Sequence, residues 1–349
     1  MTRIAVLGTG ANGGSIGADL TRAGLDVTFI EQWPEHVAAM RGHGIRVEMP
    51  DAQEVTEVRA FNLCDVATLR ERFDVVLVLV KAYDTRWACE LVKPLVADDG
   101  VVVGIQNGMT LDTIVDVMGP DRSLGAVIEI ASNMFEPGVV CRDTPRSQSW
   151  FAVGGLTAAA QHKAPDVARL LRNSGTVEVS DDILSSKWMK LVANCTELVT
   201  SAVLDLTVHE AAEIPGMREV MLEAGNEAVR TGLALGRTIR PVLGLTAQDV
   251  SDPEQVATAL FDIIHDRFVT PGQQTTVLQD WIKGRRSEVH QINGHIAAEQ
   301  ARLGGRAPVN ERVVEAARRI EAREMAPGPE AAALLLADMG SDSTPGIFN

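Results

Sequence analysis

The fold of this chain is decided by residues 3–13, which read RIAVLGTGANG. The short apolar run Ile4–Leu7 is typical of a buried parallel strand, and the glycine-rich stretch after it opens a helical segment. This order of strand, glycine loop and helix is the context that the G-x-G-x-x-G fingerprint requires. It predicts a Rossmann βαβ unit that binds a dinucleotide.

Each glycine of the loop has a physical role in such a unit. Gly8 permits the tight turn, Gly10 lets the backbone approach a pyrophosphate, and Gly13 lets the helix pack on the strand. The helix N-terminus then presents N–H groups and a partial positive charge to the phosphates. The alternative is a glycine-rich turn without a ligand. The predicted cofactor-binding residues of the loop are Gly8, Thr9, Gly10, Ala11, Asn12 and Gly13.

An acidic residue, Glu31, follows about twenty residues later at the end of the second predicted strand. A carboxylate at this point accepts hydrogen bonds from the adenosine ribose hydroxyls and repels a 2′-phosphate. The sequence therefore predicts that NAD(H) is favoured over NADP(H). Two alternatives stay open: Glu31 is a solvated charge at a strand end, or Arg41 or Arg46 reaches a phosphate.

The rest of the chain falls into two patterns. Up to about Val179, short β-branched runs alternate with helical stretches, which predicts a mainly parallel sheet. From about Asp181 onward, apolar residues recur at helical spacing. We predict an α/β Rossmann domain over residues 1–181, an all-α substrate and catalytic domain over residues 182–325, and a C-terminal extension over residues 326–349. The predicted strands are Ile4–Leu7, Val27–Glu31, Val75–Val80, Val101–Ile105, Ala126–Ala131 and Val177–Val179. The predicted helices are Asn226–Leu235, Pro253–His265, Gln274–Lys283, Val289–Arg302 and Pro329–Met339.

Composition narrows the class of partner. A formal net charge of −15 over 349 residues argues against nucleic acid, because binding a polyanion relies on Lys and Arg. We expect a small-molecule partner. No apolar run approaches the roughly 18 residues of a membrane span or resembles a secretory signal, so we expect no membrane association.

The cysteines and histidines indicate neither a disulfide framework nor a metal site. The four cysteines form no C-x-x-C pair, which favours a reducing, cytoplasmic setting. His290 and His295 have no evident third ligand, so we predict no metal site.

Five further segments extend the pattern over nearly the whole chain. They are residues 80–82 (VKA), 105–109 (IQNGM), 188–195 (WMKLVANC), 275–280 (TTVLQD) and 287–294 (SEVHQING). In order and spacing they resemble the 2-dehydropantoate 2-reductase (ketopantoate reductase) family. The resemblance implies an NAD(P)-dependent oxidoreductase acting on CH–OH/C=O groups. It also implies that the all-α domain is like the C-terminal domain of 6-phosphogluconate dehydrogenase.

The resemblance also implies roles for single residues. Lys190 matches the family's catalytic lysine, which donates a proton to the ketone oxygen as hydride arrives at carbon. Asn107 matches an asparagine beside the nicotinamide, and Glu288 matches a carboxylate that engages the lysine and the substrate. The other matches are Asn194 and Thr276 in substrate binding and Lys81 near the adenosine end of the cofactor.

The chemistry is consistent with these roles. Reduction of a ketone develops negative charge on oxygen, which a positioned ammonium stabilises and protonates. Asn194 lies one helical turn after Lys190, so both side chains project from one face. The alternatives are an ordinary surface lysine at position 190 and, at Thr276, a threonine that bonds its own helix backbone.

Two departures from the family concern the substrate. Leu198, preceded by Glu197, stands where a second asparagine is usual, and Gln273 stands where an asparagine is common. An apolar side chain cannot replace the hydrogen bonds of an amide. Our main hypothesis is therefore hydride transfer between NAD(H) and a small keto or hydroxy compound, a 2-keto or 2-hydroxy acid. The runner-up is ketopantoate reduction, and a rival of another class is a non-catalytic dinucleotide-binding regulator. The oligomeric state stays open, a homodimer being one option.

Overall fold

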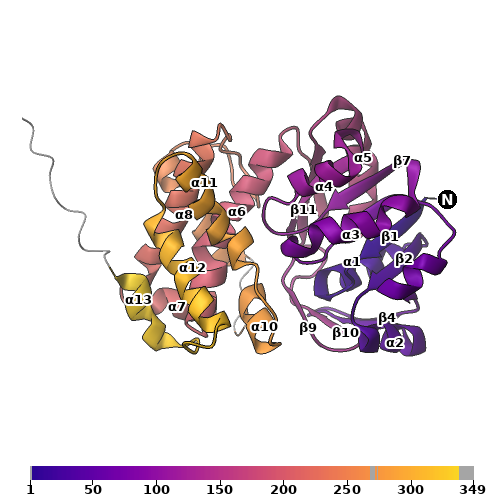
Figure 1. Ribbon diagram of the computed structural model, residues 1–349, viewed down its shortest axis with the longest axis horizontal. Coiled ribbons are helices and arrows are strands. Elements are labelled where there is room, and N and C mark those ends of the chain that lie inside the picture. The colour runs from indigo at the N-terminus through magenta and orange to yellow at the C-terminus, as the bar shows by residue number, and fades with distance from the viewer. Residues whose placement is uncertain (1, 268–271, 273, 338–349) are drawn as a thin grey trace, which may run out of the picture. The chain divides into compact units, whose positions relative to one another are not determined.

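The computed structural model describes residues 2–267, 272 and 274–337. The chain forms two compact units, Met1–Lys190 and Leu191–Asn349 (Figure 1). The first unit is α/β and the second is helical, as the sequence predicts. The junction falls within one long helix.

The first unit is built on an eight-stranded sheet in the order β12-β11-β8-β7-β6-β1-β2-β5. Neighbouring strands are parallel, except that β11 runs antiparallel to β8. All six strands predicted from the sequence are present. The strands are β1 (Arg3–Leu7), β2 (Asp26–Glu31), β5 (Arg59–Asn62), β6 (Phe73–Val78), β7 (Val96–Gly104), β8 (Ser123–Glu129), β11 (Trp150–Gly155) and β12 (Thr176–Val179).

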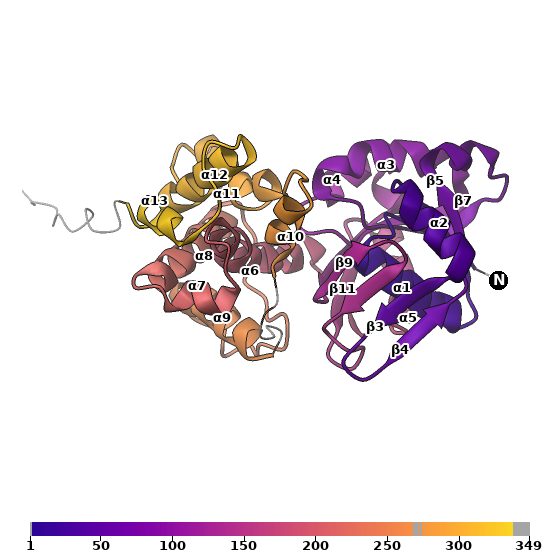
Figure 2. The ribbon, with the colours of Figure 1, turned by 90° about the horizontal axis from the view of Figure 1, so that it is seen from below.

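Both faces of this sheet are buried. On β1, Ile4 and Val6 belong to one apolar cluster, whereas Ala5 and Leu7 belong to another. Helices α1, α2 and α5 cover the first face, and α3 and α4 cover the second (Figure 2). Burial on both faces explains why β1 is a continuous apolar run rather than an alternating one. The helices are α1 (Ala11–Arg22), α2 (Pro34–His43), α3 (Thr85–Val92), α4 (Leu111–Met118) and α5 (Ala158–Leu171).

The direction of the strand order reverses at β1. The chain proceeds from β1 to β2 and β5 on one side, and from β6 to β7 and β8 on the other. Ligands of open α/β sheets bind at the carboxyl ends of the strands at such a reversal. The glycine loop after β1 and the segment after β6 both lie there.

A second sheet, which the sequence analysis does not predict, has the order β4-β3-β10-β9. Its strands are β3 (Ile45–Glu48), β4 (Gln53–Thr56), β9 (Ser132–Glu136) and β10 (Val139–Arg142). Residues Ile45, Met134 and Val140 of this sheet share an apolar cluster with Ile16 of α1. The small sheet therefore packs on the helix that follows the glycine loop.

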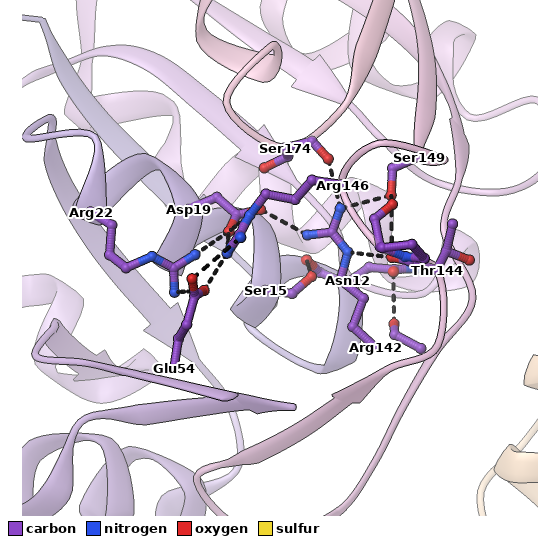
Figure 3. Close-up of polar contacts among 12 residues, drawn as sticks. Asn12, Ser15, Asp19, Arg22, Glu54, Arg142, Thr144, Arg146, Ser149 and Ser174 are labelled. Atoms are coloured by element: carbon purple, nitrogen blue, oxygen red, sulfur yellow. Dashed lines mark hydrogen bonds and ion pairs between the residues drawn. The ribbon is translucent and has the colours of Figure 1, made fainter. Parts of the chain in front are cut away.

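Five charged side chains join α1 to this second sheet and the loop after it (Figure 3). Asp19 and Arg142 form the centre, with side chains 1% and 0% exposed and an N–O distance of 2.7 Å. Arg142 also donates to the carbonyl oxygens of Thr144 and Ser174 and to Ser149 Oγ. Arg22, Glu54 and Arg146 surround the pair. Because each of the three guanidinium nitrogens of Arg142 donates to at least one oxygen, the buried cation is well compensated.

The second unit consists of helices held together by a buried polar network. Glu227 accepts from the backbone N–H groups of Val309 and Asn310, and burial raises the pKa of its carboxyl. Asn293 Nδ2 donates to Asn310 Oδ1 and to the carbonyl of Cys195. The helices are α6 (Ile183–Val203), which begins in the first unit, α7 (Val208–Glu213), α8 (Met217–Ala234), α9 (Val256–Arg267), α10 (Thr276–Ile282), α11 (Asn293–Arg302), α12 (Pro308–Glu321) and α13 (Ala332–Leu336).

The predicted helical segments of this unit overlap α8, α9, α10, α11 and α13. The end of the predicted segment Pro329–Met339 lies outside the described residues. Within the described part of the chain, no helix is both long enough and apolar enough to cross a lipid bilayer.

Replacing Arg142 by methionine should destabilise the protein strongly. The substitution keeps most of the side-chain length but leaves Asp19 and three buried acceptors without the guanidinium, and breaking a buried pair costs about 3–5 kcal/mol. Urea denaturation followed by circular dichroism measures the change. As a control, Arg169→Met removes an ion pair whose side chains are 72% and 73% exposed and should leave stability nearly unchanged. A loss below about 1 kcal/mol for Arg142→Met would contradict the role of the network.

Candidate functional site

The glycine loop brings β1 and α1 into direct backbone contact. Gly8 has a positive φ of 87°, and a Cβ placed on it would lie 2.6 Å from the backbone nitrogen of Val80. A Cβ on Gly13 would lie 2.0 Å from the carbonyl oxygen of Gly8. Such contacts are not possible for a real side chain, so both positions require glycine. These are the roles that the sequence predicts for Gly8 and Gly13.

Space remains at Gly10, where the loop enters the helix. Gly10 is the N-cap of α1 and makes no side-chain cap, and the nearest atom to a Cβ on it would be Met134 Cε, 4.0 Å away. The first N–H groups of a helix have no partner within the helix. The start of α1, with Ala11 and Asn12 partly exposed, therefore fits an anionic group such as a pyrophosphate.

Asn12, inside the fingerprint, is oriented by the second sheet. Ser132 Oγ, at the start of β9, donates to Asn12 Oδ1 at 2.8 Å, while the carbonyl of Asn12 accepts from Ser15 Oγ. The second sheet thus orients the side chain of Asn12 in the first turn of α1, in addition to packing on that helix.

Glu31 is not a solvated charge. Its side chain is buried, and its two oxygens accept four hydrogen bonds, from Thr9 N–H (2.7 Å) and Oγ1 (3.2 Å) and from the N–H groups of Gln32 (2.8 Å) and Trp33 (3.1 Å). An ionised carboxylate has about four acceptor sites. The residue therefore ties the end of β2 to the glycine loop. Its contact with a ribose stays a prediction.

His36 holds the same loop from α2. Its Nδ1 accepts from the N–H of Gly138 at 2.8 Å, and its Nε2 lies 2.9 Å from the carbonyl of Thr9. A backbone N–H can only donate and a carbonyl can only accept, so the ring is the neutral Nε2–H tautomer. Burial lowers the pKa of His36, in agreement with a neutral ring.

The two arginines considered for a phosphate are engaged elsewhere. Arg41 Nε donates to the carbonyl of Ala60, and its Nη2 pairs with Asp65 at 2.7 Å. Arg46 forms an ion pair with Glu48 at 3.1 Å. Neither contact involves Glu31 or the glycine loop.

Lys81 and Asn107 follow β6 and β7, on neighbouring strands of the sheet. The side chain of Gln106 connects the two loops, because its Nε2 donates to the carbonyl of Val80 (2.8 Å) and to Thr85 Oγ1 (2.9 Å). Gly108, with a φ of 72°, turns the chain directly after Asn107. The structure therefore brings Lys81 and Asn107 to the same edge of the sheet as the glycine loop.

Lys190 lies on α6 and forms an ion pair with Glu129, the last residue of β8. Both side chains are 12% exposed. Lys187, one turn earlier, donates to the carbonyls of Gln106 (2.9 Å) and Ala126 (3.0 Å). The first turns of α6 are thus attached to the segment after β7 and to the middle and the end of β8.

Glu129 is not among the residues predicted from the sequence. The position of Glu129 at the carboxyl end of a strand, like that of Glu31, is the signal from which it could have been predicted. Nothing in its spacing pointed to Lys190, because 61 residues separate the two.

In the second unit, hydrogen bonds bring three segments of candidate residues together. Thr275 Oγ1, at the N-cap of α10, donates to the carbonyl of Leu198 at 3.0 Å. Asn293 Nδ2 donates to the carbonyl of Cys195 at 3.1 Å. The start of α10 with Thr276, and the turn with Glu288, are thereby held against the part of α6 that carries Asn194 and Leu198. Gln273 lies outside the described residues.

Glu321 at the end of α12 was also missed. One of its oxygens accepts from the N–H (2.9 Å) and Oγ (2.6 Å) of Ser287 and from Trp281 Nε1 (3.1 Å). Ser287 directly precedes Glu288, which is buried. Glu321 therefore fixes the turn that carries Glu288.

Comparison with known proteins gives matches over both units. Residues 4–174 match the family model described as ketopantoate reductase PanE/ApbA, and residues 182–321 match its C-terminal model. The 2-dehydropantoate 2-reductase of Archaeoglobus fulgidus is 27% identical over 320 residues, which are 91% of this chain and 98% of that protein. That of Caulobacter vibrioides is 28% identical over 324 residues, covering 90% and 97%.

Solved structures agree with the sequence matches. A PanE/ApbA family ketopantoate reductase from Ralstonia eutropha is 28% identical, with a TM-score of 0.78 over 93% of this chain and 99% of that chain. D-mandelate dehydrogenase in complex with NADH and anilino(oxo)acetate has a TM-score of 0.82 over 92% and 99%, but at 20% identity it shows a likeness of fold alone. The chain belongs to the ketopantoate reductase family, whose members are NAD(P)-dependent oxidoreductases acting on keto and hydroxy groups.

Proposed function

We propose that this protein transfers a hydride between NAD(H) and a small keto or hydroxy compound, a 2-keto or 2-hydroxy acid. One observation carries the proposal. The open start of α1, the loops after β6 and β7, and the Lys190 ammonium all lie at the carboxyl ends of the parallel strands β1, β6, β7 and β8. In such folds this edge is where a dinucleotide and a reacting group meet.

Lys190, Asn107 and Glu288 have different proposed roles in the hydride transfer. When bound, a nicotinamide dinucleotide supplies or accepts the hydride at the carbonyl carbon. In the reducing direction the C=O pair of electrons moves to oxygen, and Lys190 gives that oxygen a proton from its ammonium, so that one N–H bond breaks as one O–H bond forms. Asn107 orients the reacting groups beside the nicotinamide, and Glu288 acts as the carboxylate that engages lysine and substrate.

We assign cofactor and substrate contacts to the two domains that the sequence predicts. The Rossmann domain, residues 1–181, binds the nucleotide through the glycine loop, Glu31 and Lys81. The all-α domain, residues 182–325, binds substrate, and residues 326–349 form an extension. The proposed substrate-binding residues of the all-α domain are Asn194, Thr276, Leu198 and Gln273.

The preference for NAD(H) rests on charge. A 2′-phosphate at the end of β2 would lie against the buried carboxyl group of Glu31, which already accepts four hydrogen bonds from the protein. Arg41 and Arg46 are paired with Asp65 and Glu48. Both pairs are exposed, and breaking such a pair costs at most about 1 kcal/mol, so the proposed preference rests mainly on Glu31.

Two other functions stay as alternatives. Ketopantoate reduction is favoured by the names of the relatives, whereas Leu198 disfavours it because the usual amide is absent. A regulator without activity would need only the nucleotide site. The anchoring of Lys190 by an ion pair at the sheet edge is more readily explained by catalysis.

NADH should bind more tightly than NADPH, because the dianionic 2′-phosphate must be buried against Glu31. Titration of both nucleotides by fluorescence at one ionic strength measures the difference. A tenfold or greater preference for NADPH would mean that an arginine, and not Glu31, governs the pocket.

Lys190→Ala should lower turnover by a factor on the order of 10²–10⁴, as expected for loss of a general acid, while the dissociation constant of NADH stays nearly unchanged. Steady-state rates over a panel of 2-keto and 2-hydroxy acids provide the measurement. Lys163→Ala, which removes a lysine bonded at the surface to the carbonyl of Asp99, is the matched control. Normal turnover of Lys190→Ala would exclude Lys190 from the mechanism.

Leu198→Asn should raise kcat/KM for ketopantoate by up to about tenfold, since one recovered hydrogen bond to a neutral group contributes roughly 0.5–1.5 kcal/mol. Leu233→Asn, at an exposed leucine of α8, should change nothing. Wild-type activity on ketopantoate on the order of 10⁴ M⁻¹s⁻¹ or above would contradict a shifted substrate and favour the runner-up.

A further inference from the structure

We infer that Glu129 is a positioning residue that holds the Lys190 ammonium at the carboxyl end of β8 before substrate arrives. The inference deepens the proposed function and rests on it for the catalytic meaning of Lys190. The contact itself is an ion pair between the end of β8 and Lys190, the last residue of the same unit.

The backbone at Glu129 is held by the sheet. Glu129 is the last residue of β8, which pairs with β7 up to Gly125 and with β11 as far as Glu129, where Glu129 faces Trp150 in register. The preceding residues of β8 are all buried. The carboxylate therefore reaches Lys190 from a backbone position that strand pairing sets.

The backbone of α6 is held without Glu129. Lys187 donates to the carbonyl of Gln106, which follows β7, and to that of Ala126, in the middle of β8. Asp182 accepts from the N–H of Ser185 at the start of the helix. Ser180 and Ser186 bond to each other at 2.8 Å. Glu129 therefore acts on the side chain of Lys190 rather than on the placement of the helix, and removal of its charge should leave the fold intact.

The ion pair limits where the ammonium can go. A lysine side chain has four rotatable bonds and three N–H donors in no fixed plane. One charge-assisted bond to Glu129 fixes the nitrogen and leaves the other donors for a substrate oxygen. With both side chains 12% exposed, solvent competes weakly for the bond.

Chemical labelling of Lys190 tests the contact without any assay of activity. The probe is trinitrobenzenesulfonate, and the rate of modification of Lys190 is followed by peptide mass spectrometry in the absence of substrate. The ammonium must leave the charge-assisted bond and lose a proton to solvent before its nitrogen can attack the ring of the reagent and displace sulfite. Glu129→Gln, which keeps the shape and removes the charge, should raise the labelling rate about fivefold or more, because bonds to charged groups are about twice as strong as neutral ones.

Two further variants sharpen the result. Asp116→Asn removes the charge of an exposed ion pair with Arg86 and should leave the labelling of Lys190 unchanged. Glu129→Asp keeps the charge on a shorter side chain and should give a rate between those of wild type and Glu129→Gln. If Glu129→Gln does not fold, Glu129→Asp carries the test.

Kinetics separate positioning from a structural role. Glu129→Gln should lower kcat about tenfold, with less change in KM and none in the dissociation constant of NADH, and Glu129→Asp should recover part of kcat. Unchanged labelling in both Glu129 variants, or an unchanged kcat together with faster labelling, would overturn the inference. If labelling responds as expected but Lys190→Ala retains normal turnover, the ion pair stands and the proposed role of Lys190 fails.

Discussion

The nucleotide-binding half of this protein depends on how closely α1 approaches β1. A Cβ on Gly13 would lie only 2.0 Å from the carbonyl oxygen of Gly8, so no side chain fits between helix and strand. The close contact directs the helix N-terminus toward the edge of the sheet, with Gly10 left open above it. Glu31 and His36 then hold the intervening Thr9 from β2 and α2. The close approach of α1 to β1 thus places Thr9 within hydrogen-bonding distance of both Glu31 and His36.

The same helix is secured nearer its other end by charge. Asp19 lies in the last turns of α1 and pairs with Arg142 at the end of β10, which in turn bonds to the carbonyl of Ser174 before β12. A buried pair of this kind adds little net stability over an apolar contact of the same size, because desolvation offsets much of the attraction. Its effect here is geometric. The second sheet, through Ser132 and Met134, can contribute to the glycine loop only while α1 stays in register with it.

Two acidic residues end strands of the main sheet, and their surroundings give them different roles. Glu31 at the end of β2 accepts four hydrogen bonds from uncharged donors and serves the loop. Glu129 at the end of β8 has a cation as partner. We propose that Lys190 serves the reaction shared by the family, whereas the choice of substrate depends on positions such as Leu198, where the sequence departs from the family pattern that it resembles. Shared fold and reaction class therefore do not specify the substrate.

The sequence by itself determined the parts that local patterns encode. The glycine spacing, the apolar runs of six strands and the change to helical periodicity near Asp181 each follow from constraints between near neighbours. The motif around Lys190 was recognisable for the same reason. Tertiary structure alone decided the rest. The short strands of the second sheet lack a long apolar run, and the partners of Lys190 and Arg142 lie 61 and 123 residues away along the chain. The burial of Glu31 could not be predicted either. A glutamate at the end of a strand has the same sequence pattern whether its carboxylate accepts hydrogen bonds from water or from Thr9. Such contacts depend on which strands become neighbours, and no local spacing encodes that order.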